Sequence, residues 1–245
     1  MTERKLQKYL NKTLPSIVGS RKLTPVILTD SKAKYLIRHC SSTVESQIRW
    51  RFRSGQSTER GFQWLNRNLD REMGHLDNIH LYVWLGTCDL TDYDGKFVTL
   101  AANKDIVDSL INTYQKFIDL LKPYPACKLT FFEIPPYSII DFNKSRKHSD
   151  PKSFKKDEED ILANIIKVNE HIRHINTSLN TFSPIFGADV SHHHSEKTSK
   201  SKKITLRDNY QFNLYLDGIH PDESLARVWL KKIAFHIQKD LGLIT

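Results

Sequence analysis

Apolar residues along the chain fall into two kinds of segment that follow one another in turn. Short runs rich in apolar and β-branched residues predict five strands, at residues 25–30, 47–55, 79–86, 127–136 and 183–189. Longer segments, in which apolar residues recur every three or four positions, predict helices at residues 31–40, 58–74, 103–122, 157–176 and 222–242. Strands that alternate with helices form right-handed crossovers, so the pattern predicts an α/β fold with a mainly parallel, five-stranded sheet.

Local signals refine three of these segments. Gly74 is expected to end the second helix, and Asn103 to cap the third. Segment 47–55 alternates arginines with the apolar residues Ile48, Trp50 and Phe52. Such alternation is typical of a strand with one face buried and one face in solvent.

Composition sets the size and the setting of this fold. The 245 residues, 39% of them hydrophobic, suffice for one sizeable core, so we expect a single domain over residues 1–245. No run of 18 apolar residues is present, and the charged N-terminus lacks the apolar core of a secretory signal. Three cysteines, an odd and sparse set, are typical of a reducing compartment. We therefore expect an intracellular protein, cytoplasmic or nuclear, with no membrane span.

The formal net charge of +9 is concentrated in a few places. Residues 143–156 and 191–204 carry much of it and look like basic loop insertions at the edges of the sheet. Such segments are commonly solvated loops. They are also compatible with binding to nucleic acid through several lysines, although among Phe, Tyr and Trp only Phe154 is interleaved with these lysines for base stacking. Both interpretations stay open at this point.

Polar groups follow the predicted strands at the edge where a parallel sheet binds its ligands. Asp30 and Ser31 follow the first strand, residues 54–57 the second and residues 86–89 the third, while residues 217–220 precede the last helix. Because the carboxyl ends of parallel strands meet at one edge, we expect these four loops to lie together.

The last of these loops suggests acid–base chemistry. Asp217 stands three residues before His220, with Gly218 between them, and this spacing lets the carboxylate reach Nδ1 of the imidazole. Nε2 is then available as a base for Ser31, and the amide of Gly55 is a candidate oxyanion donor. The alternatives are that Ser31 caps the helix after it, and that Asp217 only stabilises a turn.

These four blocks together resemble the SGNH, or GDSL, hydrolases. The Gly-Asp-Ser block of that family appears as Thr29-Asp30-Ser31, its second-block glycine as Gly55, its Gly-x-Asn-Asp block as residues 86–89, and its Asp-x-x-His block as residues 217–220. The resemblance spans roughly residues 24–240. It implies a flavodoxin-like three-layer sandwich and hydrolysis of esters, thioesters or acetyl groups through a serine nucleophile. It assigns Ser31, His220 and Asp217 to catalysis, with Asp30, Gly86 and Asp89 in support.

One departure from the family pattern affects the chemistry. Cys88 stands where the family has the asparagine that completes the oxyanion hole, and a thiol is a poor hydrogen-bond donor. Loss of one such donor typically costs ~3 kcal/mol of transition-state stabilisation. The oxyanion hole expected here therefore consists of the amides of Ser31 and Gly55, with Cys88 as a doubtful third member. A role of Cys88 as a second nucleophile is a further alternative, but no base for it is evident in the sequence.

These residues and the substitution at Cys88 are compatible with two functions, one enzymatic and one of binding only. The first is a serine ester hydrolase acting on a small-molecule or lipid-like ester. The second is a catalytically weak or inactive module on the same fold that binds nucleic acid or a protein partner through its basic loops. The wording of residues 84–91 and 216–222 also resembles SGNH-type domains carried by retrotransposons and related mobile elements.

Neither a metal nor a cofactor is expected. His192, His193 and His194 lie in a Ser- and Lys-rich segment with no carboxylate or cysteine at metal-ligand spacing, and His171 and His174 are expected on a helix surface. The glycine patterns of dinucleotide-binding and phosphate-binding loops are absent from the sequence.

Overall fold

The computed structural model describes residues 3–16, 23–192 and 205–244. Its centre is a parallel sheet in the order β2-β1-β3-β6, formed by Arg49–Phe52, Thr24–Thr29, Ile79–Trp84 and Lys128–Phe131. All six residues of β1 and all six of β3 are buried, which explains why both strands appear in the sequence as continuous β-prone runs. The predicted α/β fold with a central parallel sheet is confirmed.

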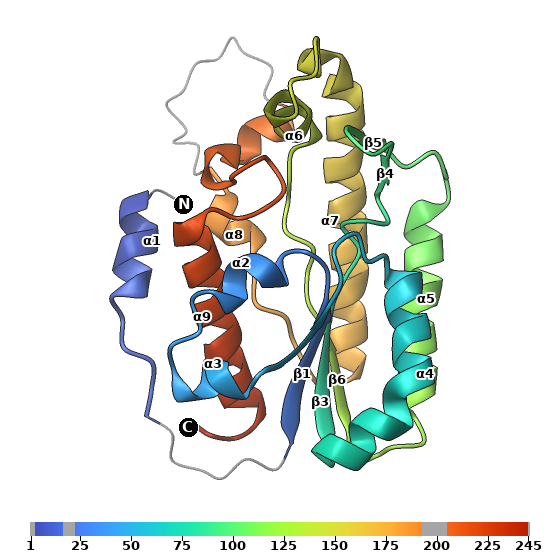
Figure 1. Cartoon of the computed structure of the whole chain (residues 1–245), viewed down its shortest axis with the longest axis vertical. Coiled ribbons are helices and arrows are strands. Elements are labelled where there is room, and N and C mark those ends of the chain that lie inside the picture. The colour runs from blue at the N-terminus through green and yellow to red at the C-terminus, as the bar shows by residue number, and fades with distance from the viewer. Residues whose placement is uncertain (1–2, 17–22, 193–204, 245) are drawn as a thin grey trace.

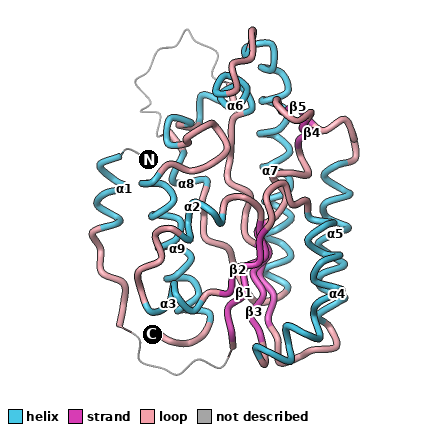
Figure 2. Tube along the Cα trace, viewed as in Figure 1, coloured by secondary structure: helices cyan, strands magenta, loops and turns pink. Residues whose placement is uncertain are grey.

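Helices cover both faces of this sheet (Figure 1). One face carries α4 (Thr58–Leu76), α5 (Ile106–Leu121) and α7 (Lys155–Ser178). The other face carries α9 (Glu223–Asp240), against which the three N-terminal helices pack. These three are α1 (Glu3–Leu10), α2 (Ala33–Ile37) and α3 (Thr43–Gln47). Figure 2 shows the strands gathered between the two helical layers.

Shorter elements complete the fold around the carboxyl edge of the sheet. They are β4 (Thr91–Tyr93), β5 (Val98–Leu100), α6 (Ile139–Ser145), η1 (Pro151–Phe154), α8 (Gly187–Val190), η2 (Arg207–Asn209) and η3 (Phe212–Leu214). The strands β4 and β5 form a separate antiparallel hairpin between β3 and α5. No pattern in the sequence predicted this hairpin, because each of its strands has only three residues.

The predicted fifth strand at residues 183–189 is wrong. Within the described residues the main sheet has four strands, and the segment forms an irregular stretch followed by α8. Its apolar character has another cause, since Phe186 is fully buried and stacks on Trp84 with a centroid distance of 4.7 Å. Pro184 also has no N–H to donate to a neighbouring strand.

Side chains take the place of a fifth strand along the outer edge of β6. The amide of Asn176 accepts from the N–H of Phe131 at 2.9 Å and donates to its carbonyl at 2.7 Å. Asn169, two turns earlier on α7, bonds both backbone groups of Ile134 in the same way, each at 2.8 Å. These four bonds satisfy backbone groups that would otherwise face the missing strand.

Helix boundaries also differ from the prediction at two places. α4 continues through Gly74 to Leu76, and it ends where Asp77 adopts a positive φ of 57°. The N-cap residue of α5 is Asp105, because Asn103 instead accepts a hydrogen bond from the Asp105 N–H in a local turn.

The N-terminal helix α1 was absent from the prediction. It is held by distant contacts, since Leu6 is buried and Lys231 Nζ of α9 donates to the carbonyl of Leu10 at 2.6 Å. A cation at the carboxyl end of a helix satisfies carbonyls that have no partner inside the helix.

The two basic segments differ in what the structure describes. Residues 143–156 are largely helical rather than an irregular loop, because they contain the end of α6, all of η1 and the start of α7. Of residues 191–204, only 191 and 192 are described. Among the described helices, none combines the length and the apolarity needed to cross a bilayer.

Candidate active site

Ser31 follows the carboxyl end of β1 and is partly exposed. Its Oγ lies 2.8 Å from Nε2 of His220. The helix after it, α2, has no side-chain hydrogen bond at its N-terminus, so the Ser31 hydroxyl does not act as a cap. The structure therefore places this hydroxyl against an imidazole 189 positions away in the chain.

Asp217 fixes the orientation of that imidazole. Its Oδ2 lies 2.8 Å from His220 Nδ1, and its Oδ1 accepts the N–H groups of Ile219 at 3.1 Å and of His220 at 2.8 Å. Burial acts to raise the pKa of Asp217, but the hydrogen bonds from His220 and Ile219 outweigh it and leave the pKa lowered. The carboxylate is thus ionised and able to stabilise an imidazolium.

Gly218 lets the Asp217–His220 loop pack directly against α6. Its φ is +91°, and a Cβ built there would lie 2.5 Å from the Ser138 carbonyl oxygen and 2.7 Å from the Phe142 nitrogen. In return, the N–H of Ser138 donates to the carbonyl of Gly218 at 2.8 Å. The position of His220 therefore depends on this close backbone contact.

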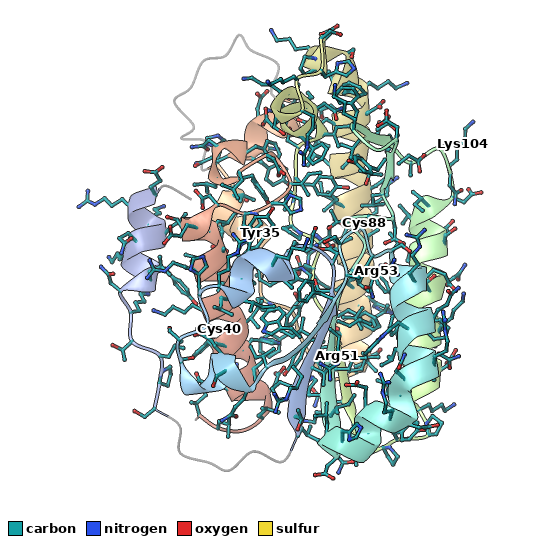
Figure 3. All side chains as sticks on the ribbon, in the orientation of Figure 1. Tyr35, Cys40, Arg51, Arg53, Cys88 and Lys104 are labelled. Carbon is teal, nitrogen blue, oxygen red and sulfur yellow. The ribbon has the colours of Figure 1, made fainter. Side chains whose placement is uncertain are left out.

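The other side of His220 is covered by Tyr35 of α2, whose ring lies 4.9 Å from the imidazole, centroid to centroid (Figure 3 labels Tyr35). Burial, followed by the nearby Asp217 carboxylate, raises the pKa of Tyr35, so its ring is neutral at ordinary pH. The sequence analysis missed this residue. In the predicted helix 31–40, residues 31 and 35 are four apart and share one face, and this spacing is the signal for Tyr35.

Lys32 is a second residue that the sequence analysis missed. Its Nζ is buried under the site, 2.5 Å from Asp30 Oδ2 and 3.0 Å from Thr87 Oγ1. The Asp30 carboxylate also accepts the backbone N–H of Lys32 at 3.0 Å. The bond to Thr87 connects the loop after β1 to the loop after β3, and Asp30 holds the Lys32 ammonium in place for it. A lysine between a serine and an alanine carries no local signal of burial.

The loop after β3 is tied to α4 through Asp89. Both oxygens of this carboxylate accept the backbone N–H of Thr58, at 3.0 and 2.9 Å, and Thr58 Oγ1 donates a further bond at 2.9 Å. Burial raises the pKa of Asp89 to about 6, against the lowering effect of these Thr58 bonds. Gly86 has a φ of +125°, and a Cβ there would collide with Ile134.

The three candidate oxyanion donors are the amides of Ser31 and Gly55 and the thiol of Cys88, and they differ in their ability to donate a hydrogen bond. Gly55 is exposed in the loop after β2 with a φ of +71°. Within the described residues, neither the Ser31 amide nor the Gly55 amide donates a hydrogen bond to the chain. Burial raises the pKa of the Cys88 thiol to about 12, and the Asp30 carboxylate acts in the same direction. Such a thiol is protonated at neutral pH, which argues against a nucleophilic role.

Among the described residues, no group of three His, Cys, Asp or Glu side chains is placed to hold a metal ion. His193 and His194 lie outside the described residues. His171 and His174 lie on α7 with their ring centroids 6.4 Å apart.

Comparisons with known sequences and solved structures identify the class of fold. No protein-family model and no curated protein sequence matches the chain. Among solved structures, a GDSL-like lipase from Bacteroides thetaiotaomicron matches over 98% of both chains with a TM-score of 0.60 and 15% identity. A lipase/acylhydrolase from Enterococcus faecalis matches over 91% of this chain and 99% of its own, with a TM-score of 0.54 and 11% identity.

An acetyl xylan esterase matches as well, over 85% of this chain and 96% of its own, with a TM-score of 0.55 and 11% identity. These likenesses hold nearly from end to end in each partner, while the identities are too low to carry the role of any single residue. Together with the parallel four-stranded sheet and its two helical layers, they show that the chain has the SGNH hydrolase fold.

Proposed function

We propose that this protein is a serine ester hydrolase of SGNH type that cleaves an ester or acetyl group. The observation that carries the proposal is the continuous line of hydrogen bonds from Ser31 Oγ through His220 to Asp217, with both links at 2.8 Å. A hydroxyl, an imidazole and a carboxylate in this order form the arrangement that activates a serine.

The reaction follows from this geometry. Ser31 Oγ attacks the carbonyl carbon while its proton moves to His220 Nε2, and Asp217 stabilises the imidazolium that forms. The carbonyl oxygen takes up the negative charge and binds the amides of Ser31 and Gly55. The intermediate then expels the alcohol, which takes the proton from His220. Water, activated by the same imidazole, hydrolyses the acyl-enzyme and restores Ser31.

The rate should be modest because Cys88 supplies no strong third donor. Each missing oxyanion donor typically lowers the rate by ~100- to 1000-fold. The alternative of a catalytically weak or inactive binding module rests on this same substitution. Binding of nucleic acid through the basic loops and the association with mobile elements both stay predictions from the sequence.

Hydrolysis of 4-nitrophenyl acetate tests the proposal. Ser31→Ala should lower the turnover of the wild type by roughly 10⁴-fold or more, the loss typical of a missing nucleophile. Ser109→Ala serves as the matched control, because Ser109 is exposed on α5. A 4-nitrophenyl phosphonate should label the wild type at Ser31, as shown by peptide mass. Absence of both turnover and label would contradict the proposal and favour the binding module.

A further inference from the structure

A groove beside the candidate active site is lined by four arginines and three aromatic residues. It has a volume of ≈ 640 Å³ and runs between β2 and α4. Its β2 wall consists of residues 50–53, and its α4 wall of Arg60, Gln63, Trp64, Arg67 and Asn68. The residues on α4 recur at intervals of three and four, so they form one stripe along the helix, opposite in character to the apolar stripe that faces the core.

Most of the positive charge in this groove is uncompensated. Arg51 is paired with the buried Glu72, whose Oε2 lies 2.7 Å from one guanidinium nitrogen and 3.0 Å from another. Among the described residues, Arg53, Arg60 and Arg67 form no ion pair, and no acidic residue lines the groove. Like charges gathered in a concave site without counterions favour an anionic ligand.

The kind of residue narrows the chemistry of that ligand. Guanidinium groups bind phosphate through two parallel hydrogen bonds, which lysines do not. Trp64 and the 40%-exposed Phe52 offer aromatic surface between the arginines, suited to a planar or apolar group. Arg60 and Arg67 stand two helical turns apart, about 10 Å along the axis. A ligand that binds both arginines must therefore span this distance and carry more than one negative charge.

The groove leads toward Ser31. In the register of the sheet Thr29 pairs with Phe52, so Arg53 stands beside Asp30, the residue before Ser31. Figure 3 shows Arg53 and Cys88 at the same end of the sheet. Gln56, which lines the groove, follows Gly55 directly. A ligand in the groove can therefore reach the candidate active site along the surface of a single loop.

We infer that this groove, defined by Arg53, Arg60, Arg67 and Trp64, binds the phosphate-bearing part of the ester substrate. The inference rests on the proposed function for the ester and on the groove itself for the phosphates. The substrate class is thus an ester whose alcohol portion carries several phosphates next to a planar or apolar group.

Two acetyl esters that differ only in phosphate provide the test: 3′-O-acetylthymidine and its 5′-triphosphate. At low salt the wild type should prefer the triphosphate by about 1000-fold in kcat/KM, since a hydrogen bond to a charged group typically contributes about tenfold and three arginines contribute. Each of Arg53→Gln, Arg60→Gln and Arg67→Gln should lower this preference about tenfold, and the triple variant should bring it close to one. Equal kcat/KM for the two esters in the wild type would overturn the inference.

Two matched controls lie on the same elements. Arg49 of β2 and Arg71 of α4 are exposed arginines that do not line the groove, so Arg49→Gln and Arg71→Gln should leave the preference unchanged. Loss of preference in these two variants would mean that total charge, rather than the groove, is responsible. The three groove arginines are themselves exposed, and unchanged urea midpoints would show that their variants fold normally.

A binding arm separates this inference from the proposed function. Thymidine triphosphate should bind Ser31→Ala by calorimetry and fail to bind the same protein with the triple groove substitution. If no ester is hydrolysed but this binding pattern holds, the proposed function fails and the phosphate site stands. If a single-stranded oligothymidylate binds the groove while the triphosphate ester is neither bound nor preferred, the groove is a nucleic-acid site and the inference is wrong.

Discussion

The buried ion pair between Lys32 and Asp30 allows a sharp test of what supports the site. The two side chains are 3% and 2% exposed, so neither charge is shared with solvent. Lys32→Met keeps most of the side-chain volume but leaves the Asp30 carboxylate buried, with only the Lys32 backbone N–H still donating to it. Removing one partner of a buried pair typically costs ~3–5 kcal/mol in the free energy of unfolding.

Urea unfolding followed by tryptophan fluorescence measures this cost. With a slope of about 3 kcal/mol per molar urea, the midpoint of Lys32→Met should fall by roughly 1–2 M. The double variant Asp30→Asn/Lys32→Met removes both charges and should recover most of the loss, because a buried pair is often replaceable by neutral groups at little cost. The coupling energy from the double-mutant cycle should exceed about 2 kcal/mol.

The surface pair between Lys116 and Glu59 is the control. Its nitrogen–oxygen distance is 2.8 Å, but the side chains are 48% and 42% exposed. Lys116→Met should therefore cost at most ~1 kcal/mol. Two results would refute the reasoning that the pair is desolvated. One is a Lys32→Met variant as stable as Lys116→Met. The other is a double variant that is no more stable than Lys32→Met.

Three further predictions concern the loops around the site. Cys88→Asn should raise kcat for 4-nitrophenyl acetate by up to ~100-fold if the new amide reaches the oxyanion, and an unchanged kcat would mean that another group completes the hole. Gly218→Ala should lower stability by more than ~3 kcal/mol and abolish turnover, because of its clash with Ser138 and its positive φ. Gly55→Ala, also at positive φ but with nothing within 4 Å of the new Cβ, should cost only ~1–2 kcal/mol, and equal losses in the two variants would contradict the packing argument. The pKa of the Asp89 carboxyl group is raised from 3.8 to about 6, so the folded state binds this proton more tightly than the unfolded state does. The free energy of unfolding should therefore fall as pH rises from about 4 to 6. Asp89→Asn should remove that part of the slope in urea unfolding at a series of pH values, and an unaltered slope would exclude Asp89 as its source.

The sequence predicts best those features that depend on neighbouring residues. β1 and β3 are buried along their whole length, so their composition alone identifies them. The Asp217–His220 spacing is similarly local, because the turn that brings the carboxylate to Nδ1 is only three residues long. The loops at the carboxyl edge follow from strand order, which the alternation of elements predicts.

Features set by distant partners could not be predicted. The apolar segment 183–189 has the composition of a strand, but burial against Trp84 produces the same composition as pairing in a sheet. The helix α1 is short, and the cation that binds its last carbonyl belongs to Lys231, more than 200 residues away. Lys32 is followed by ordinary helix-forming residues, and only the fold shows that its charge is enclosed.

The separation of 189 positions between Ser31 and His220 has a consequence for protein synthesis. At translation rates of about 5–20 residues per second, roughly 10–40 s pass between the emergence of the hydroxyl and that of its imidazole. Throughout that interval the nascent chain exposes a serine without a base. Under the proposed function, ester hydrolysis could begin only after α9 has packed against α2, so the first turnover would report a late step of folding.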